Sequence, residues 1–388
     1  MFSILALSDI YNLEGYGRLD SFMSTVKSPY ISTLSGDFIG PSKYSVLDYG
    51  KPLIDAISMI NIDYLSLGNH EFDIPLDKLS SHLSNLNLVS SNIILENTIP
   101  YTIREISGLK IGIVGICTSN FWSTYRFQVE FSNISLPKVD YLIALTHQDL
   151  EEDMLLIDSY PQIDLILGGH IHTPSHHIHK GVSIIRTGEN LERIAKIDIG
   201  FNIDVSFIEL KGYAISKRIQ KHIVKTDLQL KAISDRIIFD LNSPLDTFNM
   251  REKPNTFATF ICDYLIENLK VDYCLLNGGL FRYYGYYSSN ITLGDIMSIF
   301  PMNNPLIITS LTGKDINEAI SYSRNTKKER YGGYLHSSSN ILKSEHYVYS
   351  VIINGPLLFG MDSNPILSRV NTFGFNIDDG VPIHSLLI

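Results

Sequence analysis

Cysteine, basic charge and long apolar runs are all scarce in this chain of 388 residues. It has only three cysteines, Cys117, Cys262 and Cys274, and no two of them have the spacing of a CxxC pair. This small, odd number excludes a disulfide scaffold and is typical of buried thiols in a reducing compartment. Lys and Arg total 31 against 41 Asp and Glu, and the net charge of -10 argues against a nucleic-acid partner.

Membrane and export signals are also missing from the pattern. No stretch is long and apolar enough to cross a bilayer, so we expect no membrane partner. The opening segment MFSILALSDIYNL is apolar but has no basic residues ahead of its apolar run, which favours a first strand over a signal peptide. We therefore expect a cytoplasmic protein, and no pattern in the sequence indicates an oligomeric state.

The chain is too long for one ordinary hydrophobic core, so we expect two domains. In the first half, short apolar runs alternate with amphipathic stretches, which predicts a layered α/β domain. A charged helical stretch follows, and the second half then has its own helix, strand and glycine turns. The predicted segments are a first domain at 1–212, a linker helix at 213–234 and a second α/β domain at 235–388.

Polar side chains follow the apolar runs of the first half at the points where the runs end. Ligands of layered α/β proteins bind at the carboxyl ends of strands, so these segments are expected to place their side chains at one edge. Oxygen and imidazole donors of this kind suit Zn, Mn or Fe. The candidate ligands are Asp9, Asp37, Asn69, His147, His170 and His172, with Tyr11 as a further candidate of unusual type.

Two metal ions bound side by side need a shared carboxylate, and Asp37 is the candidate for it. His70 and Asp73 follow in the segment GNHEFD. We expect His70 to donate a hydrogen bond to developing negative charge, with Asp73 holding its ring. Three later histidines, at 176, 177 and 179, are expected in a solvated loop after Pro174.

These motifs carry a family resemblance. The order SDIY, SGDFIGPS, GNHEFD, LTHQD and GGHIH resembles the calcineurin-like metallophosphoesterases, and GNHEFD and GGHIH resemble their 5′-nucleotidase branch. In the second half LLNGGLFR, ITLGDIMSIFPMNNPLIITSLTGKDI and YGGYLHSSS resemble motifs of the same branch. The resemblance spans essentially the whole chain. It implies a four-layer α/β/β/α metallophosphatase domain followed by a smaller α/β 5′-nucleotidase C-terminal domain.

The resemblance also implies roles for individual residues. It places two divalent metal ions on the candidate ligands above and makes His70 and Asp73 a catalytic pair. It assigns phosphate binding to Arg251, Asn277 and Arg282, and ribose binding to Asp362. The arginine assignment agrees with chemistry, because guanidinium groups make bidentate, charge-assisted bonds to phosphate.

Two positions depart from the family pattern. Tyr11 stands where the family has histidine, and we interpret it as a substituted ligand in a working site; a one-metal site and an inactive site are the alternatives. Leu306 and Pro356 stand where the family has two aromatic rings that clamp the base, and neither can stack as a ring does. The tyrosines that follow the Asn-Gly-Gly turn are either replacement rings or ordinary surface and core residues: Tyr283, Tyr284, Tyr286 and Tyr287.

The predicted function is metal-dependent hydrolysis of a small phosphate ester. A nucleoside monophosphate would be cleaved to nucleoside and phosphate by metal-activated hydroxide. The alternatives are a phosphodiesterase or pyrophosphatase acting on cyclic nucleotides or nucleotide sugars, and a catalytically impaired binding protein that keeps the fold.

Overall fold

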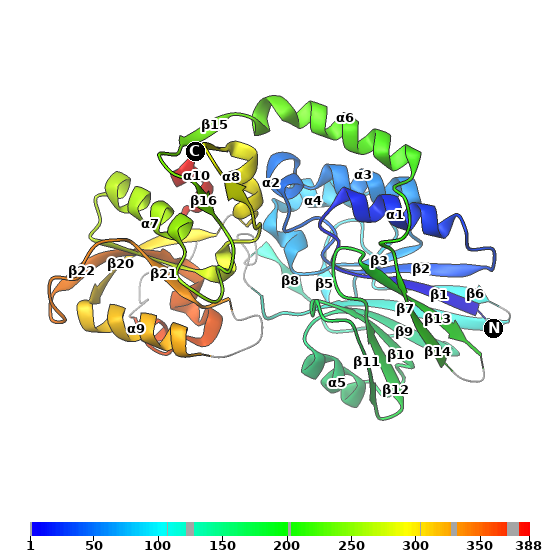
Figure 1. Cartoon of the computed structure of the whole chain (residues 1–388). Coiled ribbons are helices and arrows are strands. Elements are labelled where there is room, and N and C mark those ends of the chain that lie inside the picture. Colours follow the sequence, from blue (N-terminus) through cyan, green and yellow to red (C-terminus); the bar gives the residue numbers. More distant parts are fainter. Residues whose placement is uncertain are drawn as a thin grey trace. The chain divides into compact units, whose positions relative to one another are not determined.

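The computed structural model describes residues 2–106, 108–121, 128–200, 203–302, 304–326, 332–370 and 380–388. The chain forms two compact units: unit 1 ends at Leu230 and unit 2 begins at Lys231 (Figure 1). The boundary falls inside helix α6 (Lys217–Ser234), in the segment where a linker helix is predicted. Among the described residues, no helix has both the length and the apolar character needed to cross a bilayer.

Unit 1 is built on two six-stranded sheets. The first has the strand order β14-β13-β1-β2-β3-β4, with β1 parallel to β2. Its strands are β1 (Phe2–Leu7), β2 (Tyr30–Ser35), β3 (Tyr64–Ser66), β4 (Leu88–Val89), β13 (Arg193–Ile199) and β14 (Ile203–Glu209). The second has the order β11-β12-β10-β9-β7-β6. Its strands are β6 (Tyr101–Ile106), β7 (Leu109–Cys117), β9 (Tyr141–His147), β10 (Leu165–Gly169), β11 (Ser175–His179) and β12 (Val182–Arg186).

The alternation of side chains along the strands decides the layers, since successive residues point to opposite faces. Ile4 of β1 belongs to a buried cluster that also contains Ile143 of β9, so the two sheets face each other. Leu5 points the other way, into a cluster with helices of the first half. Ala144 likewise packs against helix α5 (Leu150–Ser159) on the outer face of the second sheet. The four-layer α/β/β/α prediction is confirmed (Figure 1).

The outer helices of the first sheet follow its strands along the chain. These helices are α1 (Leu13–Met23), α2 (Lys43–Asp48), α3 (Lys51–Ile60) and α4 (Leu76–Leu83). Helix α1 begins where it does because the Asn12 side chain accepts the Gly15 N–H at 2.7 Å, a typical N-cap bond. Asn12 also donates to Asn190 at 2.9 Å, which ties the loop after β1 to the loop after β12.

Unit 2 has a five-stranded sheet of order β21-β17-β22-β20-β23 with helices on both faces. Its strands are β17 (Tyr273–Asn277), β20 (Pro305–Thr312), β21 (Leu335–Ser337), β22 (Val348–Asn354) and β23 (Val381–Pro382). Helix α7 (Thr256–Leu269) packs on the face that carries Leu276, and helix α9 (Gly313–Asn325) packs on the face that carries Leu275. The smaller elements are α8 (Leu293–Ile299), α10 (Ile383–Leu387), and the strand pairs β15 (Ile237–Asp240) with β19 (Asn290–Thr292) and β16 (Leu245–Asp246) with β18 (Tyr286–Tyr287).

One local prediction is wrong. Residues 175–179 were expected in a loop but form the edge strand β11, antiparallel to β12. The polar sequence SHHIH can still form a strand there, because an edge strand needs only backbone pairing on one side. The three cysteines are all buried, as predicted for core thiols.

Candidate metal centre

Asp9 and Asp37 follow the neighbouring parallel strands β1 and β2, so the sheet brings the two carboxylates together. Both are buried and both have the positive φ that is rare for residues other than glycine, 55° and 53°. The N–H of Asp9 donates to the Gly36 carbonyl at 3.1 Å and so joins the two loops. A Cβ on Gly68 would lie 2.3 Å from Asp37 Oδ1, so only glycine allows this approach.

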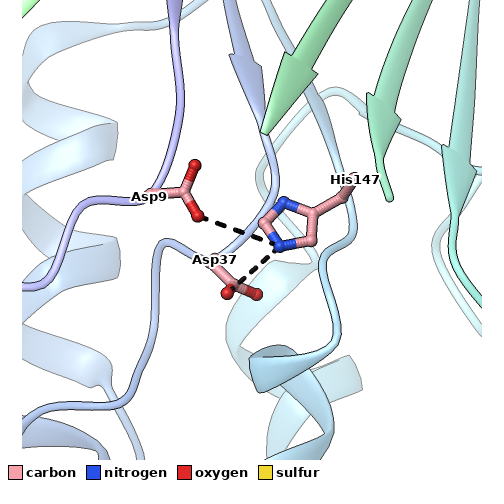
Figure 2. Close-up of side chains that lie close together, drawn as sticks. All are labelled: Asp9, Asp37 and His147. Atoms are coloured by element: carbon pink, nitrogen blue, oxygen red, sulfur yellow. Dashed lines mark ion pairs between the residues drawn. The ribbon is translucent and has the colours of Figure 1, made fainter. Parts of the chain in front are cut away.

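His147 ends strand β9 of the second sheet and is fully buried. Its Nδ1 lies 2.8 Å from the Ser35 carbonyl, which can only accept, so Nδ1 carries the proton. Nε2 then faces the carboxylates, 3.1 Å from Asp37 Oδ2 and 3.9 Å from Asp9 Oδ1 (Figure 2). Each of these three side chains offers one ligand atom within 4.8 Å of the other two, which is the spacing of a shared cation site.

The remaining histidines and Asn69 join the same cluster. The backbone nitrogen of His170 lies 3.2 Å from both carboxylate oxygens of Asp9. The ring Nδ1 of His170 lies 3.1 Å from Asn69 Oδ1. His172 Nε2 lies 3.4 Å from Asp9 Oδ1, and its other nitrogen lies 3.2 Å from Glu189 Oε2. A carboxylate behind a ligating imidazole fixes the ring and raises its basicity, a role that sequence reasoning did not give to Glu189.

Tyr11 points into this cluster. Its hydroxyl oxygen lies 3.2 Å from Asp9 Oδ1, 3.4 Å from Asp37 Oδ2 and 3.0 Å from His172 Nε2. The structure thus brings together all seven side chains that the sequence proposed as ligands, and the tyrosine occupies a donor position instead of turning away.

The electrostatics of the cluster favour a bound cation. Burial opposes charge on His147, yet the carboxylates of Asp37 and Asp9 raise its pKa to about 10. In the same way the pKa of His172 rises to about 9 against the effect of burial, through Asp9 and Glu189. Burial and the neighbouring His147 charge lower the pKa of His170 to about 4. Without a metal, the carboxylates favour the protonated, positively charged form of the imidazoles. A metal ion would supply the same positive charge, and the protein atoms around it are donors of a suitable type.

Glu71 is a site residue that sequence reasoning missed. Its buried carboxylate accepts backbone N–H bonds from Gly68 at 2.6 Å, Asp37 at 2.9 Å, Phe38 at 2.8 Å and Ile39 at 3.2 Å. Burial and the nearby Asp37 charge raise its pKa to about 7. Glu71 lies inside the motif GNHEFD, but a local sequence pattern does not show which way a side chain points.

The predicted pair of His70 and Asp73 is formed. Both lie in the short helix η1 (His70–Asp73), and His70 Nδ1 is 2.6 Å from Asp73 Oδ2. The backbone N–H of His70 also donates to Asp37 Oδ1 at 2.9 Å, so the pair is anchored to the candidate ligand cluster.

A buried ion pair behind His147 was also missed. Arg186 at the end of β12 pairs with Asp153 of α5, and both side chains are buried. Arg186 donates to the Gln148 carbonyl at 3.0 Å, and the Gln148 amide donates to Asp153 at 3.0 Å. The pair therefore holds the residue that directly follows His147.

In unit 2 the structure connects several of the predicted substrate-binding residues. Asn277, at the end of β17, donates to Asp362 at 2.9 Å and accepts from Asn354 at 2.8 Å. The backbone of Arg251 lies against the Asn-Gly-Gly turn, where a Cβ on Gly278 would come within 3.1 Å of Arg251 Cα. Arg282 follows the same turn, and its N–H donates to the Ile299 carbonyl at 2.8 Å.

The two positions where the family has aromatic clamp rings, Leu306 and Pro356, are buried. Leu306 is buried in strand β20, and Pro356 is buried in the short helix η4 (Gly355–Phe359). Of the four tyrosines, Tyr287 is a core residue, whereas Tyr283, Tyr284 and Tyr286 are about half exposed or more, at 52%, 48% and 65%.

Comparison with known families agrees with this organisation. Residues 2–174 match the calcineurin-like phosphoesterase family, and residues 237–356 match the 5′-nucleotidase C-terminal domain. The fold and the donor cluster thus define a calcineurin-like phosphoesterase domain in unit 1. With both domains present in this order, the chain belongs to the 5′-nucleotidase family.

Individual relatives are distant. The chain is 22% identical over 361 residues to the trifunctional nucleotide phosphoesterase protein YfkN of Bacillus subtilis, across 74% of this chain and 25% of that protein. It is 22% identical over 360 residues to the snake venom 5′-nucleotidase of Crotalus adamanteus, across 74% of this chain and 61% of that protein. The chain thus spans a quarter to about three fifths of the length of these two relatives.

Solved structures confirm the fold. The 5′-nucleotidase precursor from Thermus thermophilus superposes with a TM-score of 0.76 at 16% identity, covering 100% of this chain and 95% of that one. The sulfate thiohydrolase SoxB superposes with a TM-score of 0.68 at 12% identity, covering 97% and 79%. Since proteins of both names share the fold, the substrate has to be inferred from the site.

Proposed function

We propose that the protein is a metal-dependent phosphoric ester hydrolase that releases phosphate from nucleoside monophosphates. The observation that carries the proposal is the buried contact of Asp9, Asp37 and His147 at converging strand ends. Buried charges persist only when they are paired or bind a metal, and this cluster has the donor types of a divalent metal site. The two matched domains and the 5′-nucleotidase names of the relatives support the nucleotide substrate.

The residues that would hold two divalent ions, of Zn, Mn or Fe type, are the seven clustered donors around Asp37. When bound, such ions polarise the phosphoryl group and lower the pKa of a bound water to make a nucleophile. His70 would donate a hydrogen bond to a phosphoryl oxygen, and Asp73 keeps its ring in the orientation for that bond. Glu71 and Arg186 hold the backbone segments that present Asp37 and His147.

Unit 2 would bind the nucleotide. Arg251 and Arg282 are suited to phosphate because each guanidinium can make two parallel charge-assisted bonds. Asp362 supplies a carboxylate acceptor for ribose hydroxyls, and its bond from Asn277 fixes its position. Because Leu306 and Pro356 are buried, recognition of the base would be weak, and turnover would depend more on phosphate than on base identity.

Hydrolysis of phosphodiesters or pyrophosphates is the second candidate function. A trifunctional nucleotide phosphoesterase among the relatives favours it. The same metal-centred chemistry serves both ester types, so the difference must lie in how the leaving group is accommodated.

The test is phosphate release from AMP and from p-nitrophenyl phosphate in Mn, Zn, Co and Fe, with a cyclic nucleotide and a nucleotide sugar as further substrates. Asp37→Ala is the control. We expect metal-dependent turnover that the control abolishes, and the AMP to p-nitrophenyl phosphate ratio then reports base recognition. Folded protein that turns over none of these substrates with any metal would contradict the proposal and favour a binding protein.

A cytoplasmic location is part of the proposal, supported by the three buried thiols. Thiol titration of the denatured protein, purified with an alkylating agent present, should find three reactive thiols per chain.

A further inference from the structure

Four polar side chains of unit 2 form a continuous series of hydrogen bonds. Asn304, just before β20, has its Nδ2 3.3 Å from Asn354 Oδ1. Asn354 ends β22, and its Nδ2 lies 2.8 Å from Asn277 Oδ1. Asn277 ends β17, and its Nδ2 lies 2.9 Å from Asp362 Oδ2 in the short helix η5 (Met361–Ser363). The two central asparagines, Asn277 and Asn354, are buried.

The partners fix which way each amide points. Besides Asp362, the Asn277 amide nitrogen faces the Gly332 carbonyl at 3.3 Å. An ionised carboxylate and a carbonyl can only accept, so the atom that faces both must belong to the NH₂ group. The amide oxygen of Asn277 then faces Asn354, which has to donate to it. Each amide therefore has one orientation, and the donation runs from Asn304 towards Asp362.

This geometry uses both donors of Asn277. Its NH₂ group has two hydrogens, and they are directed to Asp362 and to the Gly332 carbonyl. Neither is left for a phosphate oxygen, although the family resemblance implies phosphate binding for Asn277. A Cβ on Gly279 would lie 3.2 Å from the Asn277 amide nitrogen, so glycine at position 279 keeps room for the amide.

Asp362 depends on this support. Its φ of 59° lies in the left-handed region, which is rare for a residue with a side chain. The bond from Asn277 joins this irregular turn to the end of the buried strand β17. Loss of that bond would leave the carboxylate present but displaced.

We propose that Asn354 and Asn277 are positioning residues for ribose recognition. Asn354 sets the orientation of the Asn277 amide, and Asn277 holds the Asp362 carboxylate where it accepts from ribose hydroxyls. Neither asparagine contacts the phosphate, which is left to Arg251 and Arg282. The inference rests on the proposed nucleotide-binding role of unit 2, and it makes the series of bonds a determinant of substrate class: ribose-containing esters depend on it, and esters without ribose do not.

The test compares AMP with p-nitrophenyl phosphate, which has no ribose. Asn354→Asp replaces the donating NH₂ by an oxygen that only accepts, so the Asn277 amide turns its NH₂ away from Asp362. We expect the KM for AMP to rise roughly tenfold or more, the effect of losing one hydrogen bond to a charged group, with the kinetics of p-nitrophenyl phosphate close to those of the parent. Asn340→Asp makes the same change at an exposed amide that donates to the Asp272 carbonyl and should alter neither substrate.

A double variant separates positioning from a general loss of structure. Asp362→Ala removes the carboxylate itself and should also raise the KM for AMP. Adding Asn354→Asp to Asp362→Ala should raise it no further, because residues that act through one another are not additive. A merely structural defect would add to the loss and would impair p-nitrophenyl phosphate as well. Asn304→Ala removes only the outermost donor, so it should cause a smaller rise in the KM for AMP without disturbing the buried amides.

Asn277→Ala tests whether this residue contacts phosphate. We expect weaker AMP binding with an unchanged inhibition constant for inorganic phosphate. A variant whose inhibition by phosphate weakens as much as its AMP binding would show that Asn277 is a phosphate ligand and would overturn the assignment.

Calorimetric titration of AMP into the metal-stripped full chain repeats the comparison without turnover. Equal AMP affinity in the parent, Asn354→Asp and Asn304→Ala would overturn the inference while leaving phosphate ester hydrolysis intact. Parent protein that neither binds nor hydrolyses AMP would reject the nucleotide substrate as well. The two failures are therefore distinguishable.

Discussion

The carboxylate of Glu71 accepts the backbone N–H of Asp37 at 2.9 Å, so a buried acid outside the donor cluster fixes the position of one inside it. Asp37 has a φ of 53°, a conformation that costs a residue with a side chain of order 1 kcal/mol. Further bonds from Phe38 and Ile39 to the same carboxylate stabilise this loop, and Gly68 joins it to the segment of Asn69.

The first prediction concerns this support. Glu71→Gln replaces one acceptor oxygen by an NH₂ group that faces N–H donors, so the loop of Asp37 should relax. We expect metal affinity to fall roughly 10- to 100-fold, as for other groups that orient ligands. Calorimetric titration with Zn or Mn measures this. Glu151→Gln, an exposed change on helix α5, is the control, and equal affinity in both variants would refute the role of Glu71.

The second prediction separates chemistry from metal binding. His70→Gln removes the proposed donor to the phosphoryl oxygen but none of the clustered ligands. We expect kcat to fall roughly 10²- to 10³-fold, the range for loss of one stabilising donor, with metal content unchanged. Asp73→Asn should give a smaller loss, since the ring is still present but held less firmly. Metal analysis alongside steady-state kinetics checks both, and a parallel loss of metal would argue against this division of roles.

The third prediction concerns the ion pair of Arg186 and Asp153. Arg186→Met leaves a buried carboxylate without its partner, which typically costs about 3–5 kcal/mol of unfolding free energy. The double variant Arg186→Met with Asp153→Leu removes both charges and should recover most of that loss. Urea unfolding of the three proteins provides the measurement. A double variant no more stable than the single one would show that the pair acts through its other bonds.

The fourth prediction is a pH dependence in unit 2. His336 is buried with Nε2 2.7 Å from the Met250 carbonyl, and burial lowers its pKa to about 4. The unfolded chain has an ordinary histidine pKa of about 6.5, so it takes up a proton as the pH falls while the folded protein does not. This group should therefore cost about 2 kcal/mol of stability between pH 7 and pH 5.

Unfolding at the two pH values tests this expectation. His336→Gln keeps an N–H donor but does not titrate, so the stability difference between pH 7 and pH 5 should shrink. His346→Gln alters an exposed histidine of the same unit and should leave the difference as in the parent protein. If His336→Gln behaves like that control, another group must dominate the acid sensitivity.

Much of the architecture could be predicted because it depends on local pattern. The buried runs before Asp9 and His147 are nearly continuously apolar, as two-sided burial requires, and they became β1 and β9. The strand β11 was missed because its histidines give no apolar alternation. The same contrast holds for the site. Residues at strand ends could be proposed as metal ligands from the sequence, whereas the supporting roles of Glu71 and Arg186 could not.

The sequence by itself determined the fold class and the types of donor at each strand end, because alternation and strand termination are properties of short segments. Tertiary structure alone decided that Tyr11 and His172, 161 positions apart, meet at 3.0 Å. It also decided that Glu71 turns inward and that Arg186 reaches Gln148. The direction of a buried side chain depends on which distant backbone groups need a hydrogen-bond partner, and that need arises only after the sheets have packed.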